Sequence, residues 1–586
     1  MLKFALPLVL LVVCVSAVFA QQRTYCNPIN IDYGYTPFER FSEQGRHRAT
    51  ADPVIVNFRD TLYLFSTNQE GYWYSADMLD WTFVYRKFLL DDKYTHDLNA
   101  PAAWVMGDSL YVYGSTWELD FPIWKSGNPT VDDWEIAVDT LNVGAWDPAF
   151  HYDEEDDRLY LYWGSSNEFP LLGTEIRTGD LQTTGLTRPI MKLHPDDHGW
   201  ERFGEYNDNV FLAPFVEGAW VTKHNGKYYF QYAAPGTEFS GYADGVLVSE
   251  NPLGGFRYQA HNPFSYKPGG FARGAGHGAT FQDKHGQYWH VSTIFISVKN
   301  NFERRLGIWP AGFDADDVMY CNTAFGDYPT LLPGAAEGKD FTEGLFAGWM
   351  LLNYQKPVQV SSTLGGFHPN FAVDEDIRTY WSAATGEAGE WLQTDLGEVS
   401  TIHAIQVNYA DQDAEFLGKT LGKKHQYVIH GSNDGQAWEV VVDKRENQTD
   451  VPHDYIELPE PVQFRYLKLE NHAMPTGKFA ISGFRVFGRG AGEKPAPVED
   501  FVVLRASREK DGNRLASWMK WRNHPEADGY NIYFGKDPDK LYGSIMVYGD
   551  NNYYFTGMDK ADTYYFQIEA FNENGISERS EVRKVE

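Results

Sequence analysis

The sequence predicts an all-β chain in which a five-bladed β-propeller is followed by two β-sandwiches. Three observations support this prediction. Aromatic residues make up 16% of the 586 residues, a turn-plus-strand unit recurs five times before residue 335, and two later segments have alternating patterns of their own. Aromatic residues suit the half-buried surface of a pleated sheet. A loose repeat of this length is typical of a propeller or a solenoid.

The first residues have the pattern of a secretory signal. Lys3 precedes an apolar run that ends near Ala20, and Gln21 follows. A basic start, a short apolar middle and a small residue before the cleavage point are typical of such signals. We therefore expect residues 1–20 to be removed and the mature chain to be exported, to the periplasm, the cell surface or the medium. No later stretch is long and apolar enough to predict membrane insertion.

Charge and cysteine content narrow the partners and the covalent links. A net charge of −31 argues against nucleic acid or an anionic membrane as a partner, because both are polyanionic. Outside the predicted signal the chain has two cysteines, Cys26 and Cys321. In an oxidising compartment they could pair and so join the first and last strands of the predicted propeller. Two buried free thiols are the alternative.

The predicted propeller, residues 25–335, contains five pieces that turn at a polar pair and continue into a strand with alternating aromatic residues. These pieces are residues 59–65, 107–113, 156–162, 225–230 and 285–290. Polar pairs such as Asn-Gly between apolar runs are strong hairpin signals. Five such sheets around one axis form a five-bladed propeller.

Three acidic residues each begin a blade of the predicted propeller. They are Asp52 in an Ala-Asp-Pro sequence, Asp147 in Trp-Asp-Pro, and Glu217 before a glycine. Because the innermost strands face the central channel, we expect these side chains to meet in one pocket. Most glycoside hydrolases need a proton donor and a carboxylate that activates water, and a third acid can tune their pKa values. The sequence therefore predicts a glycoside-cleaving enzyme, although each acid alone could be a turn residue.

These residues resemble the motifs of glycoside hydrolase family 43, whose members are five-bladed propellers that hydrolyse with inversion. The resemblance covers residues 25–333 and implies that Asp52 is the general base and Glu217 the general acid. It also implies that Asp147 modulates the pKa of the acid and orients it. The glycine-rich segment 274–278 is similar to the family segment that places a histidine, here His277, near the propeller axis, often beside a metal ion. A hydrogen-bonded interior histidine is the alternative.

Four further residues are expected to contact substrate. Trp104 and Trp146 could wall the pocket, with core packing as the alternative for each. Arg304 or Arg305 could contact sugar hydroxyls, with a surface charge as the alternative. The second blade departs from the family pattern, because Ala102 follows Ala-Pro where many members carry an acidic residue.

Residues 350–488 have a different pattern, with a Thr-Tyr-Trp-Ser sequence at 379–382 and Gly-Ser-Asn-Asp-Gly at 431–435. This set resembles the discoidin, or coagulation factor 5/8 type C, domain and the family 32 carbohydrate-binding modules. The resemblance implies a β-sandwich with a structural calcium ion, for which Asp374, Asp376 and Thr379 are the expected loop ligands. Binding sugar and bracing the propeller are both open roles.

The end of the chain predicts one more small domain. Residues 489–497 are rich in glycine and proline and are typical of a linker. Residues 498–586 alternate in polarity and are similar to a fibronectin type III domain, which is a small β-sandwich. We expect a spacer or an interaction module.

Taken together, these features predict an exported, inverting, exo-acting glycoside hydrolase that acts on side chains of plant or algal polysaccharides. Removal of α-L-arabinofuranosyl groups is the first expectation, and β-xylosidase or an exo-galactan-type activity are the alternatives in the same family. Catalysis of this type requires no cofactor. The alternative of another class is a catalytically inactive carbohydrate-binding protein, against which the presence of all three acids speaks.

Overall fold

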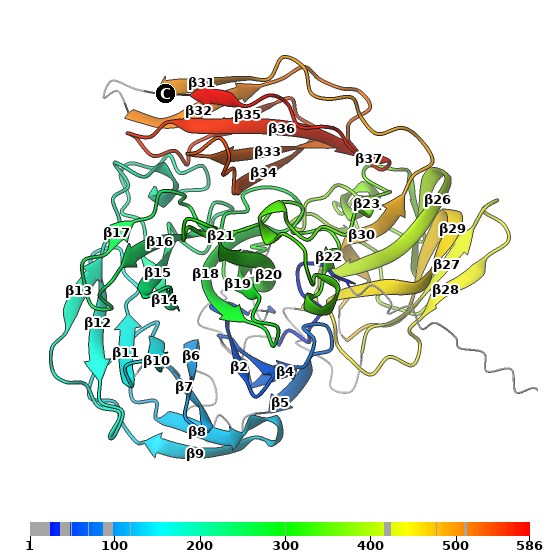
Figure 1. The fold of residues 1–586 in the computed structure, drawn as a ribbon. Helices are drawn as coiled ribbons and strands as arrows, with labels where there is room; N and C mark the ends of the chain where they lie inside the picture. Colours follow the sequence, from blue (N-terminus) through cyan, green and yellow to red (C-terminus); the bar gives the residue numbers. More distant parts are fainter. Residues whose placement is uncertain are drawn as a thin grey trace, which may run out of the picture.

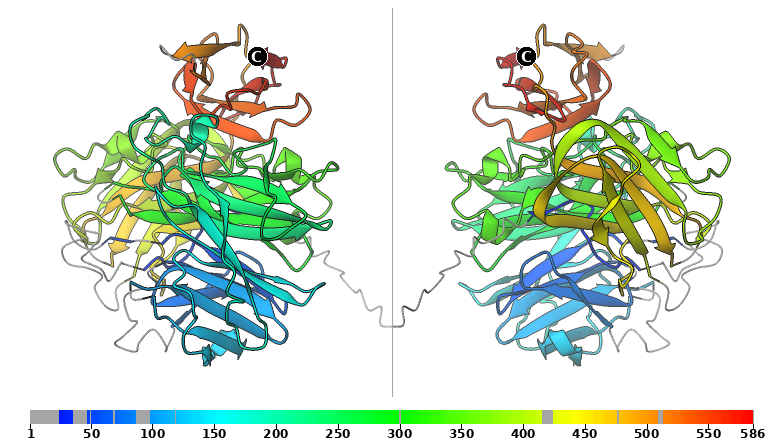
Figure 2. Two further views of the ribbon diagram at one scale, coloured as in Figure 1. Left: turned by 90° about the vertical axis from the view of Figure 1, so that its left-hand side faces the viewer. Right: turned by 90° about the vertical axis from the view of Figure 1, so that its right-hand side faces the viewer.

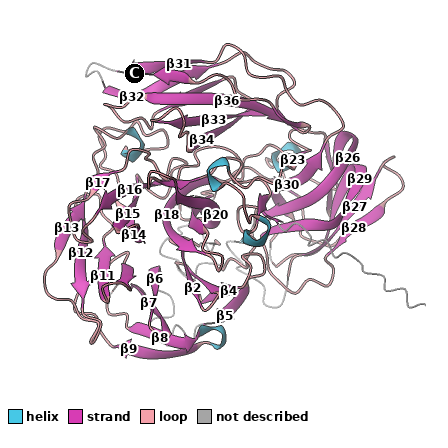
Figure 3. Cartoon of the chain, viewed as in Figure 1, coloured by secondary structure: helices cyan, strands magenta, loops and turns pink. Residues whose placement is uncertain are grey.

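The computed structural model describes residues 24–585 apart from 35–46, 49, 68, 86–97, 118, 299–300, 415–423, 476 and 509–512. The predicted signal, residues 1–20, lies outside this part of the chain. Strands dominate the described residues (Figure 3). The described helices are 3-10 turns of three or four residues: η2 (Pro129–Val131), η3 (Gly199–Glu201), η4 (Pro333–Ala335), η5 (Phe341–Glu343) and η6 (Pro369–Ala372). Within these ranges no helix has the length and apolarity that crossing a bilayer requires.

Five blades of antiparallel strands surround a common axis, which confirms the predicted five-bladed propeller (Figure 1). The last two blades are joined into one sheet by a parallel pairing of Ala243 with Ala275. The first blade contains β2 (Val54–Phe58), β3 (Thr61–Phe65), β4 (Gly71–Ser75) and β5 (Thr82–Tyr85). The second contains β6 (Asn99–Met106), β7 (Ser109–Ser115), β8 (Ile123–Asn128) and β9 (Asp133–Val138). The third contains β10 (Ala149–Asp153), β11 (Arg158–Trp163), β12 (Leu171–Ile176) and β13 (Arg188–Met191). The fourth blade contains β14 (Glu217–His224), β15 (Lys227–Ala234), β16 (Ala243–Ser249) and β17 (Arg257–Tyr258). The fifth contains β18 (Arg273–Gln282), β19 (Tyr288–Phe295), β20 (Arg304–Phe313) and β21 (Met319–Cys321).

Hairpins between the first two strands of a blade lie where the polar pairs predict them. Asn225 and Gly226, between β14 and β15, have φ values of 47° and 74°, and Arg59 and Asp60, between β2 and β3, have 54° and 60°. Positive φ at both central residues gives the turn whose twist matches that of paired strands. The two ends of the propeller are held together by β1 (Thr24–Tyr25), which pairs antiparallel with β22 (Thr330–Leu331).

The second domain is a β-sandwich built around two long bent strands. Strands β26 (Trp391–Tyr409) and β29 (His453–Ala473) pair along most of their length, with register shifts between Asp395 and Ser400 and between Ile402 and Ala404. Such irregularities bend strands and let one strand serve both faces of a sandwich. The remaining strands are β23 (Met350–Leu351), β24 (Val358–Val360), β25 (Trp381–Ser382), β27 (Gln426–Ser432), β28 (Glu439–Asp443) and β30 (Ala480–Arg489).

The third domain consists of two sheets that pack face to face, above the propeller in both views of Figure 2. One sheet contains β31 (Val502–Arg508), β32 (Asn513–Lys520) and β35 (Asn552–Phe555). The other contains β33 (Gly529–Gly535), β34 (Gly543–Tyr548), β36 (Tyr564–Asn572), β37 (Gly575–Ile576) and β38 (Arg583–Val585). The fold is thus a second β-sandwich, and its likeness to a fibronectin type III domain stays a prediction.

Buried charged side chains join the propeller to the second domain. The guanidinium of Arg48 lies 2.7 Å from a carboxylate oxygen of Asp411 and 2.7 Å from one of Asp450. Arg485 in β30 lies 2.9 Å from Glu375 and donates to the backbone carbonyl of Asp327 at 2.6 Å. All five side chains are buried. Each arginine lies next to a carboxylate, so every buried charge in this set has a partner of opposite sign.

The third domain packs directly on the propeller. The backbone N–H of Gly199 donates to the carbonyl of Met558 at 2.9 Å, and a Cβ at this glycine would lie 2.3 Å from the carbonyl oxygen of Thr556. Beside this contact, His198 pairs with Asp559 at 2.8 Å. A side chain at position 199 would therefore separate the two domains.

Cys26 and Cys321 are both free and buried, so the disulfide alternative is wrong. Cys26 Sγ donates to the carbonyl of Asp327 at 3.3 Å, in an apolar cluster with Phe325 and Phe487. Cys321 ends strand β21 in a separate cluster of the last two blades. Burial raises the pKa of the Cys26 thiol to about 12, which keeps it protonated and unreactive.

Candidate active site

One end of the propeller is formed by the starts of the five innermost strands. There, one residue per blade has a left-handed backbone, and we call these five the blade-entry positions: Asp52 (φ 50°), Ala100 (40°), Asp147 (50°), Gly218 (65°) and His277 (47°). Residues other than glycine rarely adopt this conformation, and it costs free energy. Adjacent blades hold it in place, since the backbone N–H of Asp52 donates to Thr293 Oγ1 at 3.0 Å and that of Asp147 to Ser115 Oγ at 2.8 Å.

Asp52 lies among groups that stabilise its ionised form. Thr67 Oγ1 donates to Oδ2 of Asp52 at 2.6 Å, His277 Nδ1 lies 3.2 Å from Oδ1, and Arg304 lies 3.6 Å from the same oxygen. Burial raises the pKa of Asp52, but His277, Arg304 and the Thr67 hydroxyl outweigh it and hold the pKa below its ordinary value. A carboxylate kept ionised in this way can accept a proton from water.

Asp147 and Glu217 form a close pair of acids with His277. One potential ligand atom of each of the three residues lies within 4.8 Å of the others. Burial raises the pKa of Asp147 well above its ordinary value, and repulsion by Glu217 and Asp52 raises it further, against the opposing effect of His277. Two carboxyl groups this close favour a state in which the pair retains one proton.

Two hydroxyl groups fix the orientation of Glu217. Tyr242 donates to Oε1 at 2.6 Å, and Ser165 Oγ donates to Oε2 at 2.9 Å. The flanking Gly218 has no room for a side chain, because a Cβ there would lie 3.0 Å from atoms of both Ala233 and His277. The carboxyl group of Glu217 therefore stays directed toward the histidine and the other acids.

His277 lies at the centre of the acidic residues, as the glycine-rich segment predicts. Burial lowers its pKa, but Asp52, Asp147 and Glu217 raise it above the ordinary histidine value. The donor atoms of the last two acids and His277 are close enough to hold a cation. A cation there would favour ionised carboxyl groups at both acids and so oppose proton donation. The predicted association of His277 with a metal ion therefore stays a prediction.

The two adjacent arginines of β20 point in opposite directions. Arg304 reaches the site, where it lies 3.6 Å from Asp52 and donates to Thr237 Oγ1 at 3.2 Å. Arg305 is 1% exposed and donates to His453 of the second domain at 2.9 Å. Successive side chains of a strand alternate between its two faces. The expected contact of Arg305 with substrate is therefore wrong, and Arg305 belongs to the domain interface.

The two tryptophans also differ. Trp104 is 3% exposed and stacks on Phe150 with a centroid distance of 4.0 Å, so its expected place in the pocket wall is wrong and it packs in the core. Trp146 is half-buried beside Asp147 and contacts Trp117 at a centroid distance of 5.2 Å. Trp117 is 49% exposed, so this pair is accessible next to the acids.

The expected calcium loop is occupied by internal contacts. Thr379 Oγ1 donates to Asp374 at 2.6 Å, and Asp376 lies 3.3 Å from both Arg273 and Arg378. Two guanidinium groups beside one carboxylate oppose a bound cation. The three residues thus lie together as expected, but their surroundings do not fit a calcium site.

Sequence reasoning missed several residues that support the acids. Tyr242 and Ser165 hold Glu217, Thr67 holds Asp52, and Glu238 lies close enough for Glu217 to raise its pKa in addition to the effect of burial. A signal exists in the sequence for some of them. Four of the five repeat pieces are followed within four residues by two hydroxyl-bearing residues, at 66–67, 115–116, 165–166 and 292–293.

The fold and these acids are typical of glycoside hydrolases with a propeller domain. Residues 47–319 match the model of glycosyl hydrolases family 43, and residues 357–484 match that of the F5/8 type C domain. The propeller is therefore a glycosyl hydrolase family 43 domain, and the first sandwich is an F5/8 type C domain. No curated protein matches the chain.

Several solved structures are similar to the chain. A thermostable family-43 glycoside hydrolase has 20% identity and a TM-score of 0.41, with 51% of this chain and 96% of that chain covered. A xylan β-1,4-xylosidase from Bacillus halodurans C-125 has 14% identity and a TM-score of 0.41, with 79% and 100% covered. An α-L-arabinofuranosidase from Clostridium thermocellum ATCC 27405 has 18% identity and a TM-score of 0.35, with 46% and 93% covered.

Proposed function

We propose that the chain is an exported, inverting exo-glycosidase that removes α-L-arabinofuranosyl groups from side chains of plant or algal polysaccharides. The observation that supports this best is the contrast between the acids. The pKa of Asp52 is lowered, and that of Asp147 beside Glu217 is raised. Acids with opposed environments are suited to act as base and as proton source in one reaction.

In the proposed reaction Asp52 is the general base. Its ionised carboxylate takes a proton from a water molecule, and the resulting hydroxide attacks the anomeric carbon from the face opposite the leaving group. The bond between that carbon and the glycosidic oxygen breaks as the new bond forms, so the configuration is inverted. This geometry requires about 6.5–9.5 Å between the two catalytic carboxyl groups, which leaves room for the water.

Glu217 is the proposed general acid. It protonates the departing glycosidic oxygen, which then leaves as a hydroxyl group of the shortened polysaccharide. Asp147 helps because its charge would repel that of an ionised Glu217, which favours a pair that holds one proton. Tyr242 and Ser165 orient the donor, and Trp146 with Trp117 offers an accessible aromatic surface for the sugar. The reaction needs no cofactor.

The sugar is tested by product analysis. Purified protein without residues 1–20 would be incubated with arabinan, arabinoxylan, arabinogalactan and nitrophenyl glycosides, and the released sugar identified by chromatography. We expect arabinose as the sole product, and proton NMR of the fresh product should show the inverted anomer. Sole release of xylose or galactose would replace the substrate assignment by that of a xylosidase or an exo-galactan hydrolase.

Matched variants separate catalysis from binding. Glu217→Gln should abolish release, whereas Glu154→Gln, an exposed glutamate in the turn between β10 and β11, should release sugar at the native rate. Absence of release by the native chain from every substrate, with sugar binding retained, would contradict the proposal and identify a carbohydrate-binding protein. Export would be checked by N-terminal sequencing of the protein from the cell exterior, which should begin near Gln21.

A further inference from the structure

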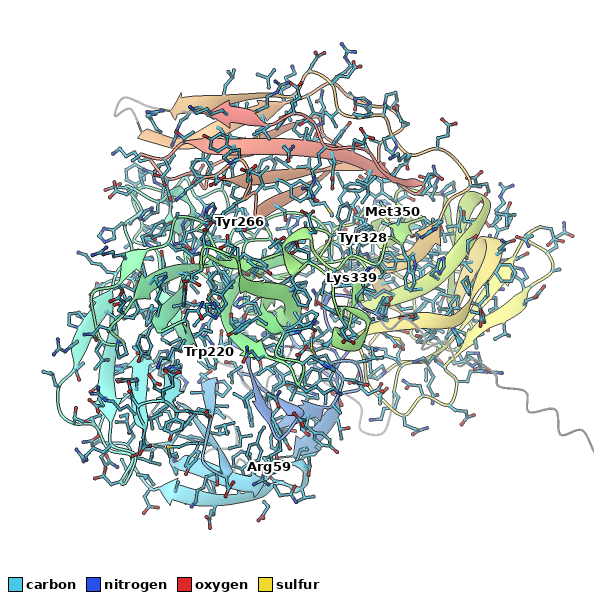
Figure 4. All side chains as sticks on the ribbon, in the orientation of Figure 1. Arg59, Trp220, Tyr266, Tyr328, Lys339 and Met350 are labelled. Atoms are coloured by element: carbon cyan, nitrogen blue, oxygen red, sulfur yellow. The ribbon has the colours of Figure 1, made fainter. Side chains whose placement is uncertain are left out.

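The three domains together line a half-open cavity of about 490 Å³. The propeller lines it with the loops that contain Tyr206 and Gly241, the F5/8 type C domain with residues 374–379, and the third domain with residues 546–556. Tyr266, labelled in Figure 4, packs against Phe534 at the propeller side of this junction. A volume of this size is in the range of small-molecule pockets, which often lie between domains.

Two segments of the cavity wall also position the catalytic groups. Gly241 lines the cavity, and the next residue, Tyr242, donates to Glu217 at 2.6 Å. Arg273 lines it as well and is the first residue of β18, the strand that contains His277. Residues 241–242 and 273–277 therefore run from the cavity wall to the active site, and an extended ligand that follows them can reach both.

The wall is held in shape by charged contacts between domains. Glu205 accepts hydrogen bonds from the backbone N–H of Ser240 at 2.9 Å and from its hydroxyl at 2.6 Å. The same carboxylate lies 3.5 Å from Arg378 of the second domain, and Asp376 lies 3.3 Å from both Arg378 and Arg273. Because each guanidinium faces a carboxylate, the cavity is preformed and needs little ordering to bind a ligand.

The lining suits a neutral ligand with many hydroxyl groups. Tyrosine rings line it from all three domains, at positions 206, 266, 354, 548, 553 and 554, and Tyr206 is 70% exposed. Five acidic residues, 205, 374, 375, 376 and 550, face two arginines, so the excess negative charge disfavours an anion. Rings with an apolar face and a polar edge, next to carboxylates and amides, are the groups that bind both the C–H face and the hydroxyls of a sugar.

We propose that this three-domain cavity binds a neutral oligosaccharide segment of the same polysaccharide whose terminal sugar enters the active site. This inference rests on the proposed function for the identity of the ligand. It assigns the F5/8 type C domain and the third domain a shared part in substrate selection. A long substrate then gains contacts that a nitrophenyl glycoside cannot make.

The test measures binding without turnover. In the Glu217→Gln protein, isothermal titration calorimetry with arabinohexaose, xylohexaose and galactohexaose would give the dissociation constants. Adding Tyr206→Ala should weaken binding of at least one of these hexasaccharides about fivefold or more, because one aromatic face is lost. Tyr206→Phe should bind more tightly than Tyr206→Ala. Tyr85→Ala, at a 59% exposed tyrosine of the first blade, is the control and should leave binding unchanged.

Kinetics of the otherwise native chain separate the cavity from the active site. Tyr206→Ala should raise the KM for the polysaccharide while kcat/KM for the nitrophenyl glycoside stays within twofold of native. Unchanged hexasaccharide binding, or an equal loss on the small glycoside, would overturn the inference. The inference would also be overturned if the native cavity bound calcium and the Asp550→Ala variant lost that binding, while Asp550→Ala left sugar binding unchanged. If the native chain cleaves no glycoside, the proposed function fails, and calorimetry alone decides whether the cavity binds sugar.

Discussion

Two regions of this molecule bury clusters of charged side chains, and they balance those charges differently. At the interface between the propeller and the F5/8 type C domain, Arg48 lies between Asp411 and Asp450. At the active site, Asp147 and Glu217 lie close together and share His277. The pKa of Asp411 is lowered because Arg48 outweighs burial, whereas burial and like charges raise the pKa of Asp147.

The comparison separates charges that hold domains together from charges that do chemistry. A buried ion pair with matched partners has no tendency to exchange protons near neutral pH. At the active site, burial and like charges raise the pKa of Asp147, and this residue lies on a strained backbone that Ser115 of the adjacent blade holds. Substitutions that alter one region at a time test this difference, from the largest expected effect to the smallest.

The largest effect should come from the proposed base. Asp52→Asn removes the carboxylate but keeps the size of the side chain, and we expect kcat/KM to fall by about 10²–10⁴-fold. The melting temperature should change little, since the strand pairings remain. Asp156→Asn, at an exposed turn residue, is the control and should keep native activity. Full activity of the Asp52 variant on a good substrate would show that another group is the base.

The interface should respond in stability instead of activity. Arg48→Met leaves Asp411 and Asp450 buried without their cation, and we expect the free energy of unfolding to fall by about 3–5 kcal/mol at pH 7. The lowered pKa of Asp411 means that its contribution is present above the ordinary aspartate pKa of about 4 and is lost as pH falls through the folded value. The difference between native and variant should therefore narrow in acid.

Urea denaturation at several pH values measures both effects. Arg59→Met, at an arginine whose side chain is 59% exposed, is the matched control and should cost little. Equal stabilities of the native and Arg48→Met proteins at pH 7 would mean that the buried cluster does not join the domains.

A smaller effect concerns the pH dependence of activity. His277→Gln removes a positive charge 3.2 Å from Asp52 and should raise the pKa of that carboxyl group. The base then becomes protonated at a higher pH, so the acid limb of the profile of kcat/KM should move toward neutral pH. The exposed His285→Gln variant should keep the native profile. A shift of the acid limb to lower pH would contradict the assigned contact.

The smallest effect is expected from a solvent-exposed pair. Arg158 lies 2.6 Å from Glu175 on the third blade, and its side chain is 48% exposed. Arg158→Ala should lower the free energy of unfolding by less than about 1 kcal/mol, because water screens exposed charges. A loss as large as that of Arg48→Met would mean that burial does not distinguish the two kinds of pair.

The fold and the main acids could be predicted from local sequence patterns. The polar turns, the alternating strands and the three acids that open blades predict the propeller and the meeting of Asp52, Asp147 and Glu217. These features depend on short-range chain geometry and on a repeat, both of which are visible in one sequence. The place of His277 near the axis comes instead from the resemblance of residues 274–278 to the glycine-rich segment of the family.

The residues predicted wrongly depend on distant parts of the chain. The sequence does not tell whether Arg304 or Arg305 faces the pocket. Successive side chains of a strand point to opposite faces, but the sequence does not show which face lines the pocket. Trp104 packs on Phe150 of the next blade, and the loop of Asp376 meets Arg273 from another domain. Such contacts form only when separate elements pack. The sequence alone therefore cannot decide between core, interface and site.

The blade-entry positions also limit how this scaffold can be redesigned. Four of them are an acid, the histidine or the glycine after Glu217, whereas Ala100 presents only a methyl group from a backbone with φ of 40°. A library that aims to alter sugar preference there should be limited to glycine, asparagine and aspartate, the residues that best tolerate this backbone. β-branched residues at the same place would destabilise the second blade before they could contact a sugar. The backbone of the propeller thus determines which side chains a protein engineer can usefully introduce at that entrance.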